Sequence, residues 1–226
     1  MKLNVLYEDN HIIVVEKIVN IPSQADKTGD LDMLTIIKDY LKEKYNKPGT
    51  VYLGLVHRLD RPVGGVMVFA KTSKAASRLS EEVRSKQFEK KYLVIANGKF
   101  ENTIGTMEDY LLKNESKNMS KVVKEGTKNS KLAKLDYKII KYDPDLNLSV
   151  AKINLHTGRH HQIRVQLSSR DHSIYGDQKY GGRGHGKQIC LWAYSLKIVH
   201  PVTKEELTFE LYPEKIGSWK ILEDCL

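Results

Sequence analysis

Residues 57 to 71 decide how the rest of this sequence is interpreted, and they read His57-Arg58-Leu59-Asp60-Arg61-Pro62-Val63-Gly64-Gly65-Val66-Met67-Val68-Phe69-Ala70-Lys71. The start of this stretch crowds one carboxylate, Asp60, among cationic neighbours. Pro62 and the pair Gly64-Gly65 predict a tight turn directly after it. The apolar run from Val66 to Ala70 then predicts a buried β-strand. The stretch therefore predicts one acid on a turn that leads into the core.

The crowded carboxylate admits two interpretations. Cationic neighbours favour the ionised form of Asp60, which suits a nucleophile or a base better than a proton donor. Structural ion-pair networks crowd charges in the same way, so a surface ion-pair turn is the other interpretation. The local charges alone do not decide between a chemical and a structural role.

The same stretch resembles a known enzyme signature. His57-Arg58-Leu59-Asp60, followed by Gly65, an apolar run and Ala70-Lys71, is similar to the motif of RluA-type pseudouridine synthases, which isomerise uridine in RNA. The resemblance implies that Asp60 is the catalytic aspartate. This chain has Val63-Gly64-Gly65 where the family usually has Thr-Ser-Gly, so glycine retains the turn but a hydroxyl is lost.

Length and charge narrow the class of protein. A chain of 226 residues can bury a core without disulfides or metals, and we expect one catalytic domain over residues 1–226 without a separate N-terminal RNA-binding domain. The formal net charge of +9 favours a polyanionic partner such as RNA or DNA. The apolar runs are too short for a signal segment or a membrane span, so we expect a cytoplasmic protein. Cys190 and Cys225 have no partner spacing and predict neither a disulfide nor a zinc site.

The pattern of apolar residues predicts many strands and few helices. Asp30 is expected to cap a helix with Leu34, Ile37 and Leu41 inside, and Thr72 or Ser73 to cap another. The predicted strands cover residues 5–7, 11–15, 51–56, 66–70, 90–98, 135–142, 148–155, 189–199 and 207–211. Strands and helices do not alternate regularly, which indicates an α+β protein. The family resemblance implies a mixed, largely antiparallel bent sheet with flanking helices.

A second site candidate is Tyr92 in the stretch Lys90-Lys91-Tyr92. By resemblance, Tyr92 matches the active-site tyrosine of the family. A phenol can stack on a flipped base and, beside a cation, remove a proton from it. Tyrosine is also a common strand residue, so its position alone would not indicate a site.

The segment from Lys113 to Lys134 is strongly basic. It carries seven lysines against two glutamates, separated by small polar residues. Its low hydrophobicity predicts a mobile hairpin or loop instead of a packed element. Lysines such as Lys117, Lys121 and Lys124 suit phosphate contacts that hold RNA without reading its sequence, although a solvated lysine face is the usual explanation.

The third site candidate reads His156-Thr157-Gly158-Arg159-His160-His161-Gln162-Ile163-Arg164-Val165-Gln166. Thr157-Gly158 is expected to open a helix with His160, Arg164 and Leu167 on one face. The stretch resembles a second signature of the same family, in which a late arginine pairs with the catalytic aspartate. The resemblance carries that role to Arg164, with Arg159 as the alternative. Gln166 stands where relatives usually have histidine.

Two other motifs in the sequence are incomplete. His156 with His160 or His161 lacks a third metal ligand at suitable spacing, and Arg159 would repel a cation, so no metal is expected. Residues 181–187 contain the Gly-x-x-x-x-Gly-Lys part of a nucleotide-binding loop, but Gln188 replaces the Ser or Thr and a strand follows. We expect a flexible loop beside the site there, because Gly176-Asp177 and Tyr180-Gly181 resemble a third family segment.

These observations predict an isomerase, an RNA pseudouridine synthase, that acts on rRNA or tRNA. The reaction needs no cofactor or nucleotide, and no membrane partner is expected; the protein is expected to be a monomer. The resemblance makes Asp60, Tyr92 and Arg164 catalytic. The expected RNA contacts are Arg58, which is a candidate to fill the vacated stack, and His57, Arg61, Arg159, Lys117, Lys121 and Lys124. A catalytically silent RNA-binding or ribosome-assembly factor with the same fold is the main alternative, and a phosphoryl-transfer enzyme a distant third.

Overall fold

The protein folds into two compact units. The computed structural model describes residues 3–85, 87–181, 184, 187–223 and 225. Unit 1 comprises Met1–Glu89 and Ala193–Tyr212, and unit 2 comprises Lys90–Trp192 and Pro213–Leu226. Each unit contains one part of the signature residues, so each is described by itself.

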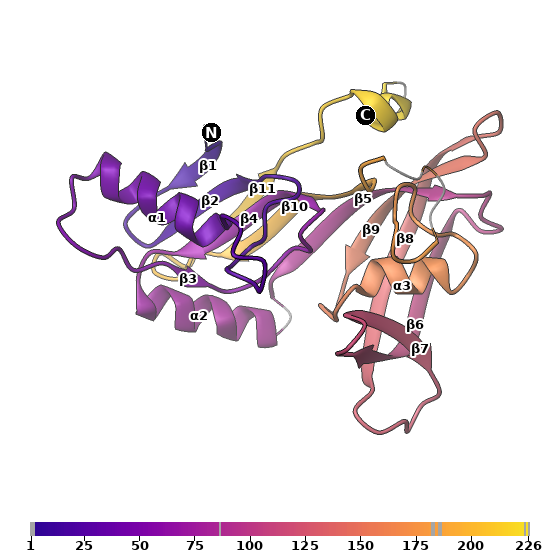
Figure 1. The fold of residues 1–226 in the computed structure, drawn as a ribbon, viewed down its shortest axis with the longest axis horizontal. Coiled ribbons are helices and arrows are strands. Elements are labelled where there is room, and N and C mark those ends of the chain that lie inside the picture. The colour runs from indigo at the N-terminus through magenta and orange to yellow at the C-terminus, as the bar shows by residue number, and fades with distance from the viewer. Residues whose placement is uncertain (1–2, 86, 182–183, 185–186, 224, 226) are drawn as a thin grey trace. The chain divides into compact units, whose positions relative to one another are not determined.

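Unit 1 is a sheet with two helices packed on it (Figure 1). Its elements are β1 (Val5–Glu8), β2 (Ile12–Lys17), α1 (Met33–Lys44), β3 (Gly54–Leu55), β4 (Gly64–Ala70), α2 (Ser73–Arg84), β10 (Leu191–Val199) and β11 (Glu206–Glu210). The strand order is β1-β2-β4-β10, with β3 also paired to β4 and β11 to β10. Every residue of β4 is buried. The apolar run after Asp60 is therefore a central strand covered on both faces, as the sequence predicted.

The helix caps show where local prediction succeeded and where it was wrong. Thr72 caps α2 and accepts a hydrogen bond from the Ala75 amide. Asp30, however, does not cap α1; Asp32 does, and its carboxylate accepts from the amides of Leu34 and Thr35. Asp30 instead pairs with Arg61. Both aspartates precede the helix, and Asp32 is the one directly before its first residue, Met33.

Unit 2 is an antiparallel sheet of mostly long strands with one short helix (Figure 1). Its elements are β5 (Glu89–Asn97), β6 (Ile104–Asn114), β7 (Met119–Val123), β8 (Lys131–Asp143), β9 (Leu148–Leu155), α3 (Gln162–Ser168) and the 3-10 turn η1 (Gly217–Leu222). The strand order is β5-β9-β8-β6-β7. The predicted hairpin across residues 143–147 is confirmed, since β8 and β9 pair antiparallel from Leu135↔Leu155 to Asp143↔Leu148.

Two predictions for unit 2 were wrong in part. The lysine-rich segment does contain a hairpin, since β7 pairs with β6, but it is packed, because the buried Leu111, Ala133 and Val165 form a small core beside it. The helix after the second signature begins at Gln162 instead of Thr157. His161 adopts a left-handed φ of 53°, which interrupts a helix, so His160 lies outside α3 and does not share a face with Arg164.

The predicted fold class is confirmed. All strand pairs with a described register run antiparallel, and three α-helices accompany them within the described ranges, which is a mixed α+β protein with an open sheet. Among the helices in the described part of the chain, none combines the length and apolar character needed to cross a membrane.

A buried lysine at the end of β2 holds the turn that contains Asp60. Lys17 is 0% exposed, and its ammonium donates to the carbonyl oxygens of Ile18 at 3.0 Å, Arg61 at 2.7 Å and Val63 at 2.7 Å. Burial lowers the pKa of Lys17 to about 7, while the negative charge of Asp60 opposes this shift. The Val63 amide also donates to the Asp60 carbonyl. Both ends of the turn are thereby fixed.

Gly65 allows β10 to approach this turn. Its φ is 124°, and a Cβ atom there would lie 2.2 Å from the carbonyl oxygen of Ala193 on β10. Real Cβ atoms do not make such contacts, so only glycine fits. The glycine of the first signature is therefore required by backbone packing in unit 1.

Replacing Lys17 with Met keeps the length of the side chain and removes the donors of three carbonyl groups. We expect the free energy of unfolding at pH 7 to fall by about 2–4 kcal/mol, because buried acceptors lose their partners. Urea unfolding measures this loss, with Lys42→Met on the exposed surface of α1 as the control.

The loss should widen above pH 7. Between the lowered pKa of about 7 in the folded state and the ordinary value of 10.5, the unfolded chain binds a proton at Lys17 that the folded chain has released. Wild-type stability therefore gains from rising pH in this window, and the variant lacks that gain. A difference that shrinks between pH 7 and 9 would contradict the lowered pKa of Lys17.

Candidate active site

The turn before β4 presents Asp60 between a buried and a charged neighbour. Leu59 is buried, and its backbone is fixed by Ser23, whose hydroxyl donates to the Leu59 carbonyl at 2.9 Å and accepts from its amide. Side chains alternate along this extended stretch, so Arg58 is exposed and Asp60 is half-buried. The side chains of Asp60 and Arg58 thus project from a backbone that Lys17 and Ser23 both hold through hydrogen bonds.

The other cations of the first signature have structural partners. Arg61 donates from Nε to the Asn20 carbonyl at 3.1 Å and from its terminal nitrogens to Thr28 and Asp30. It therefore orders the loop before α1. His57 accepts a hydrogen bond from the Val68 amide at 3.1 Å, and its ring meets Phe88 edge-on. RNA binding by Arg61 and His57 stays a prediction, and Arg58 and Arg61 are the exposed cations of the three.

Tyr92 lies in the middle of β5, where it is 6% exposed and pairs with Ile153 of β9. Lys90 precedes it by two residues, so both side chains lie on the same face of the strand. Burial lowers the pKa of Lys90. A half-buried ammonium and a phenol therefore share one face of unit 2.

The second signature forms a hydrogen-bonded loop against β8. The Thr157 hydroxyl accepts from the Lys134 amide at 2.8 Å and donates to Gln162 Oε1 at 2.8 Å. Gln162 Oε1 also accepts from the Arg159 amide, and its Nε2 donates to the Lys134 carbonyl. Thr157 and Gln162 thus hold this loop in place, a role that was not predicted from the sequence although both residues stand within the motif beside Arg159.

Arg164 is buried and makes a forked ion pair inside unit 2. Its Nε and Nη2 donate to the two carboxylate oxygens of Asp177 at 2.7 and 2.8 Å, and the residues are 4% and 1% exposed. The Tyr180 ring lies 5.3 Å from the guanidinium carbon. The pairing of Arg164 with Asp60 stays a prediction. What unit 2 does bring together is the second signature and the Gly-Asp-x-x-Tyr-Gly segment.

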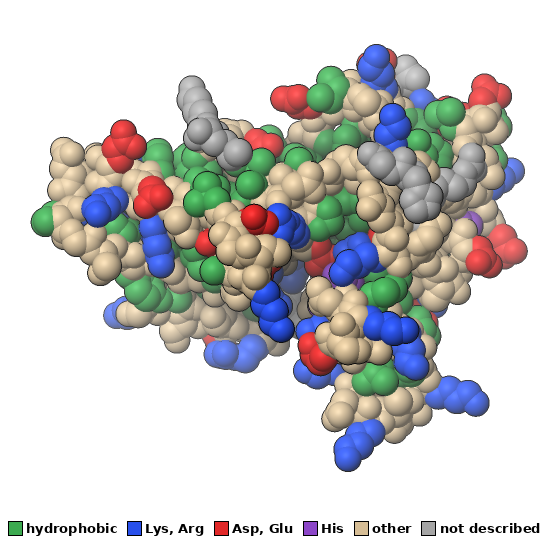
Figure 2. All heavy atoms as spheres, viewed as in Figure 1, with side chains coloured by type: hydrophobic (Ala, Val, Ile, Leu, Met, Phe, Trp, Pro, Cys, Tyr) green, Lys and Arg blue, Asp and Glu red, His purple; other side chains and the backbone are tan. Residues whose placement is uncertain are grey.

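The same tyrosine anchors the basic hairpin. Tyr180 Oη accepts from the Ser120 amide of β7 at 2.7 Å and lies 2.9 Å from His161 Nδ1. Ser120 Oγ is 2.9 Å from His160 Nδ1, and the two histidine rings stack at 3.7 Å. Lys117, Lys121 and Lys124 are exposed on and around β7. Figure 2 shows Lys and Arg side chains standing out around the position of β6 and β7 in Figure 1.

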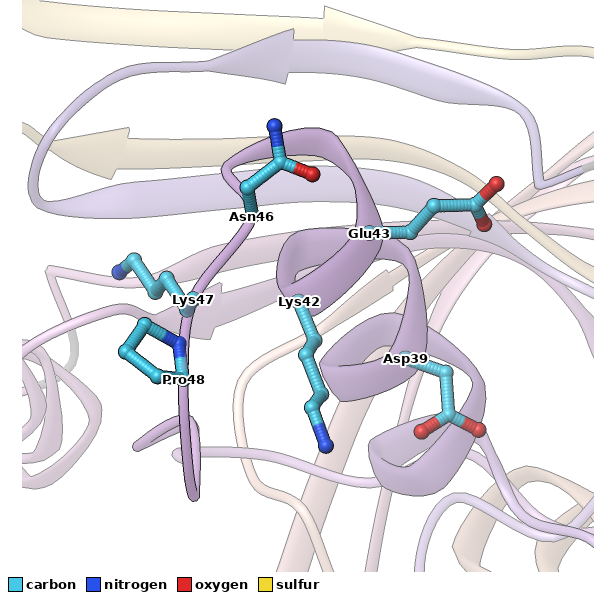
Figure 3. A pocket seen from close by; sticks show the side chains of 6 residues that line it. All are labelled: Asp39, Lys42, Glu43, Asn46, Lys47 and Pro48. Atoms are coloured by element: carbon cyan, nitrogen blue, oxygen red, sulfur yellow. The ribbon is translucent and has the colours of Figure 1, made fainter.

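A surface hollow at the end of α1 is lined by Asp39, Lys42, Glu43, Asn46, Lys47 and Pro48. Its side chains point away from one another and include no signature residue (Figure 3). The flexible loop predicted at 181–187 lies partly outside the described residues, which omit 182, 183, 185 and 186. No cluster of three potential metal ligands occurs in the described part of the chain.

Comparison with known proteins matches the chain to one family. The RNA pseudouridylate synthase family model covers residues 11–169. The chain is 31% identical to the "Uncharacterized RNA pseudouridine synthase YhcT" of Bacillus subtilis over 214 residues, which are 92% of this chain and 68% of that protein. It is 31% identical to the "Ribosomal large subunit pseudouridine synthase C" of Escherichia coli over 216 residues, 91% of this chain and 65% of that protein.

A solved structure agrees in fold. "Human RNA Pseudouridylate Synthase Domain Containing 4" superposes with a TM-score of 0.79 at 22% identity, covering 93% of this chain and 89% of that one. The family model spans more than half of the chain, and both signatures lie within its range. The chain therefore belongs to the RluA-type RNA pseudouridylate synthase family, whose members are isomerases.

Proposed function

We propose that this protein converts uridine to pseudouridine in structured RNA, with ribosomal RNA as the first candidate and tRNA as the second. The name of the E. coli relative supports the choice of ribosomal RNA. The net charge of +9 and the exposed lysines around β7 support a polyanionic substrate. The observation that carries the proposal is the Asp60 turn, which holds one half-buried carboxylate on a rigid backbone beside the exposed Arg58.

The proposed reaction breaks the glycosidic C–N bond, turns the uracil and rejoins it through carbon. Asp60 acts on the ribose, as a nucleophile at C1′ or as a base at C2′. Flipping the target base out of the stack costs a few kcal/mol. Arg58 fills the space in the stack that the base leaves. Tyr92 handles the base and Arg164 pairs with Asp60, as in the family that the motifs resemble. Reactant and product are isomers, so the chemistry consumes no redox equivalent and transfers no group.

We also propose that residues 1–226 act as one catalytic domain and work as a cytoplasmic monomer without a cofactor. The support for the single domain is that the signatures are divided between the two units, Asp60 in unit 1 and Tyr92 with Arg164 in unit 2. Neither unit has the full set by itself.

Asp60→Asn tests the proposed chemistry, because it keeps the shape of the side chain and removes its charge. Conversion of uridine in bulk RNA should fall by about 10³-fold or more, while RNA affinity and melting temperature stay close to wild type. Asp39→Asn on the exposed surface of α1 is the matched control and should retain full activity. Full activity in Asp60→Asn would refute the mechanism. A folded wild-type protein that binds RNA and converts no uridine would favour the silent binding factor.

Arg164→Lys keeps the positive charge and loses the fork to Asp177. A lysine ammonium cannot bond both carboxylate oxygens in the same geometry, so turnover should fall by about 10²-fold and stability by about 1–3 kcal/mol. Turnover is measured well below the melting temperature, so that unfolding does not contribute. Asp177→Asn shows whether the loss acts through this ion pair. Near-normal turnover in Arg164→Lys would mean that another residue, with Arg159 as the alternative, has the predicted role.

The lysines around β7 should supply non-specific affinity. Replacing Lys117, Lys121 and Lys124 with Ala should weaken RNA binding and reduce the log–log salt slope by about 0.7 for each lost contact to single-stranded RNA. The control replaces three exposed lysines of unit 1, Lys42, Lys47 and Lys74, and should leave the slope unchanged. If the salt slope of the Lys117, Lys121 and Lys124 variant were unchanged, these lysines would face solvent and make no contact with RNA.

A further inference from the structure

We propose that the loop Gly158-Arg159, together with Lys90, is a built binding site for one phosphate group of the RNA strand. The inference rests on the proposed RNA substrate and deepens it, since it separates one fixed phosphate contact from the diffuse attraction of the lysines. All of its residues belong to unit 2. The site combines a guanidinium, a backbone amide and a half-buried ammonium.

Arg159 is held through its backbone amide and its Nε, while its two terminal nitrogens are open to a ligand. Its Nε donates to the Leu132 carbonyl at 2.7 Å, and its backbone amide donates to Gln162 Oε1 at 3.0 Å. The residue is nevertheless exposed, and no residue in the described ranges accepts a hydrogen bond from its two terminal nitrogens. A guanidinium fixed through Nε presents those two nitrogens as a fork, which matches the spacing of two phosphate oxygens.

The loop beneath Arg159 is rigid before any ligand arrives. Thr157 and Gln162 bond each other, and both bond the backbone of Lys134 on β8. The His156 amide also donates to the Lys134 carbonyl. A ligand at this loop therefore orders no backbone on binding, and more of the interaction energy remains as affinity.

Gly158 leaves room where a side chain would close the site. Its φ is not in the left-handed region, so its backbone does not require glycine. Apart from chain neighbours, the single described heavy atom within 4 Å of a Cβ at this position is Lys90 Nζ, at 3.3 Å. The residue is exposed, and its amide has no acceptor among the described residues. A phosphate can thus approach the bare backbone closely.

Lys90 adds charge at the place where Gly158 leaves space. Burial of this side chain disfavours its charged form and lowers its pKa. An anion beside the ammonium would offset this cost of burying the charge. A fully solvated lysine has no such cost to offset. This distinguishes Lys90 from Lys117, Lys121 and Lys124, which are exposed.

The first experiment measures binding of oligouridylate RNA over a series of salt concentrations. Arg159→Lys keeps the charge and loses the fork, so affinity should fall about tenfold with an unchanged salt slope. Arg84→Lys, the same change at an exposed arginine of α2, should have no effect. Gly158→Ala keeps the Arg159 contacts and blocks the approach, and should weaken binding about threefold or more without a change in melting temperature. Wild-type affinity in both loop variants would overturn the proposal.

The second experiment identifies the chemical group that is bound. Amide NMR signals of Gly158 and Arg159 should shift with uridine 5′-monophosphate and with inorganic phosphate at millimolar concentration, and not with uridine. Arg159→Lys should abolish these shifts. Shifts with uridine of equal size, or none with either phosphate, would overturn the phosphate site. Both experiments measure binding alone, so loss of the proposed isomerase activity in the wild type would be recognised separately in the conversion assay.

Discussion

The structure of unit 1 depends on one buried ammonium. Lys17 ends β2 with all three of its hydrogen bonds directed to backbone carbonyls, two of which belong to the turn after Asp60. A lysine with 0% exposure is costly, and its lowered pKa reflects that cost. In return, a strand end and a turn 44 to 46 residues later in the chain are joined at one point. Ser23 adds a second anchor at Leu59. The position of the Asp60 backbone is therefore set by long-range polar contacts and not by the turn sequence alone.

Unit 2 uses a buried arginine in a comparable way. Arg164 in α3 and Asp177 in the following loop neutralise each other where water is excluded, and the fork specifies their relative orientation. Tyr180 stacks near that guanidinium and also bonds Ser120 of β7. One buried ion pair thus connects the second signature to the hairpin that carries the lysines. Breaking it would leave an uncompensated charge in the interior, which is far more costly than losing a surface pair.

The basic residues of this family member fall into two physical kinds. Lys117, Lys121 and Lys124 are exposed point charges, suited to attract RNA from a distance and sensitive to salt. Arg159 and Arg61 are held by backbone carbonyls at Nε, so their guanidinium planes are oriented. The terminal nitrogens of Arg61 bond the loop before α1, whereas Arg159 is exposed to solvent. Similar residues in two signatures thus have different uses, which depend on whether a carboxylate such as Asp30 folds back onto them.

By itself the sequence determined the family, the α+β class, the buried strand after Asp60 and the hairpin of β8 and β9, because these follow from local motifs and apolar periodicity. Tertiary structure decided the rest. Asp32 caps α1 while Asp30 pairs with Arg61, and β7 is a strand because β6 and a small apolar core of Leu111, Ala133 and Val165 cover it. The left-handed backbone conformation of His161 makes α3 begin at Gln162, later than the predicted start at Thr157. The partners of Lys17 and Arg164 were equally hidden, since hydrogen bonds between residues distant in the chain leave no periodic signal in sequence.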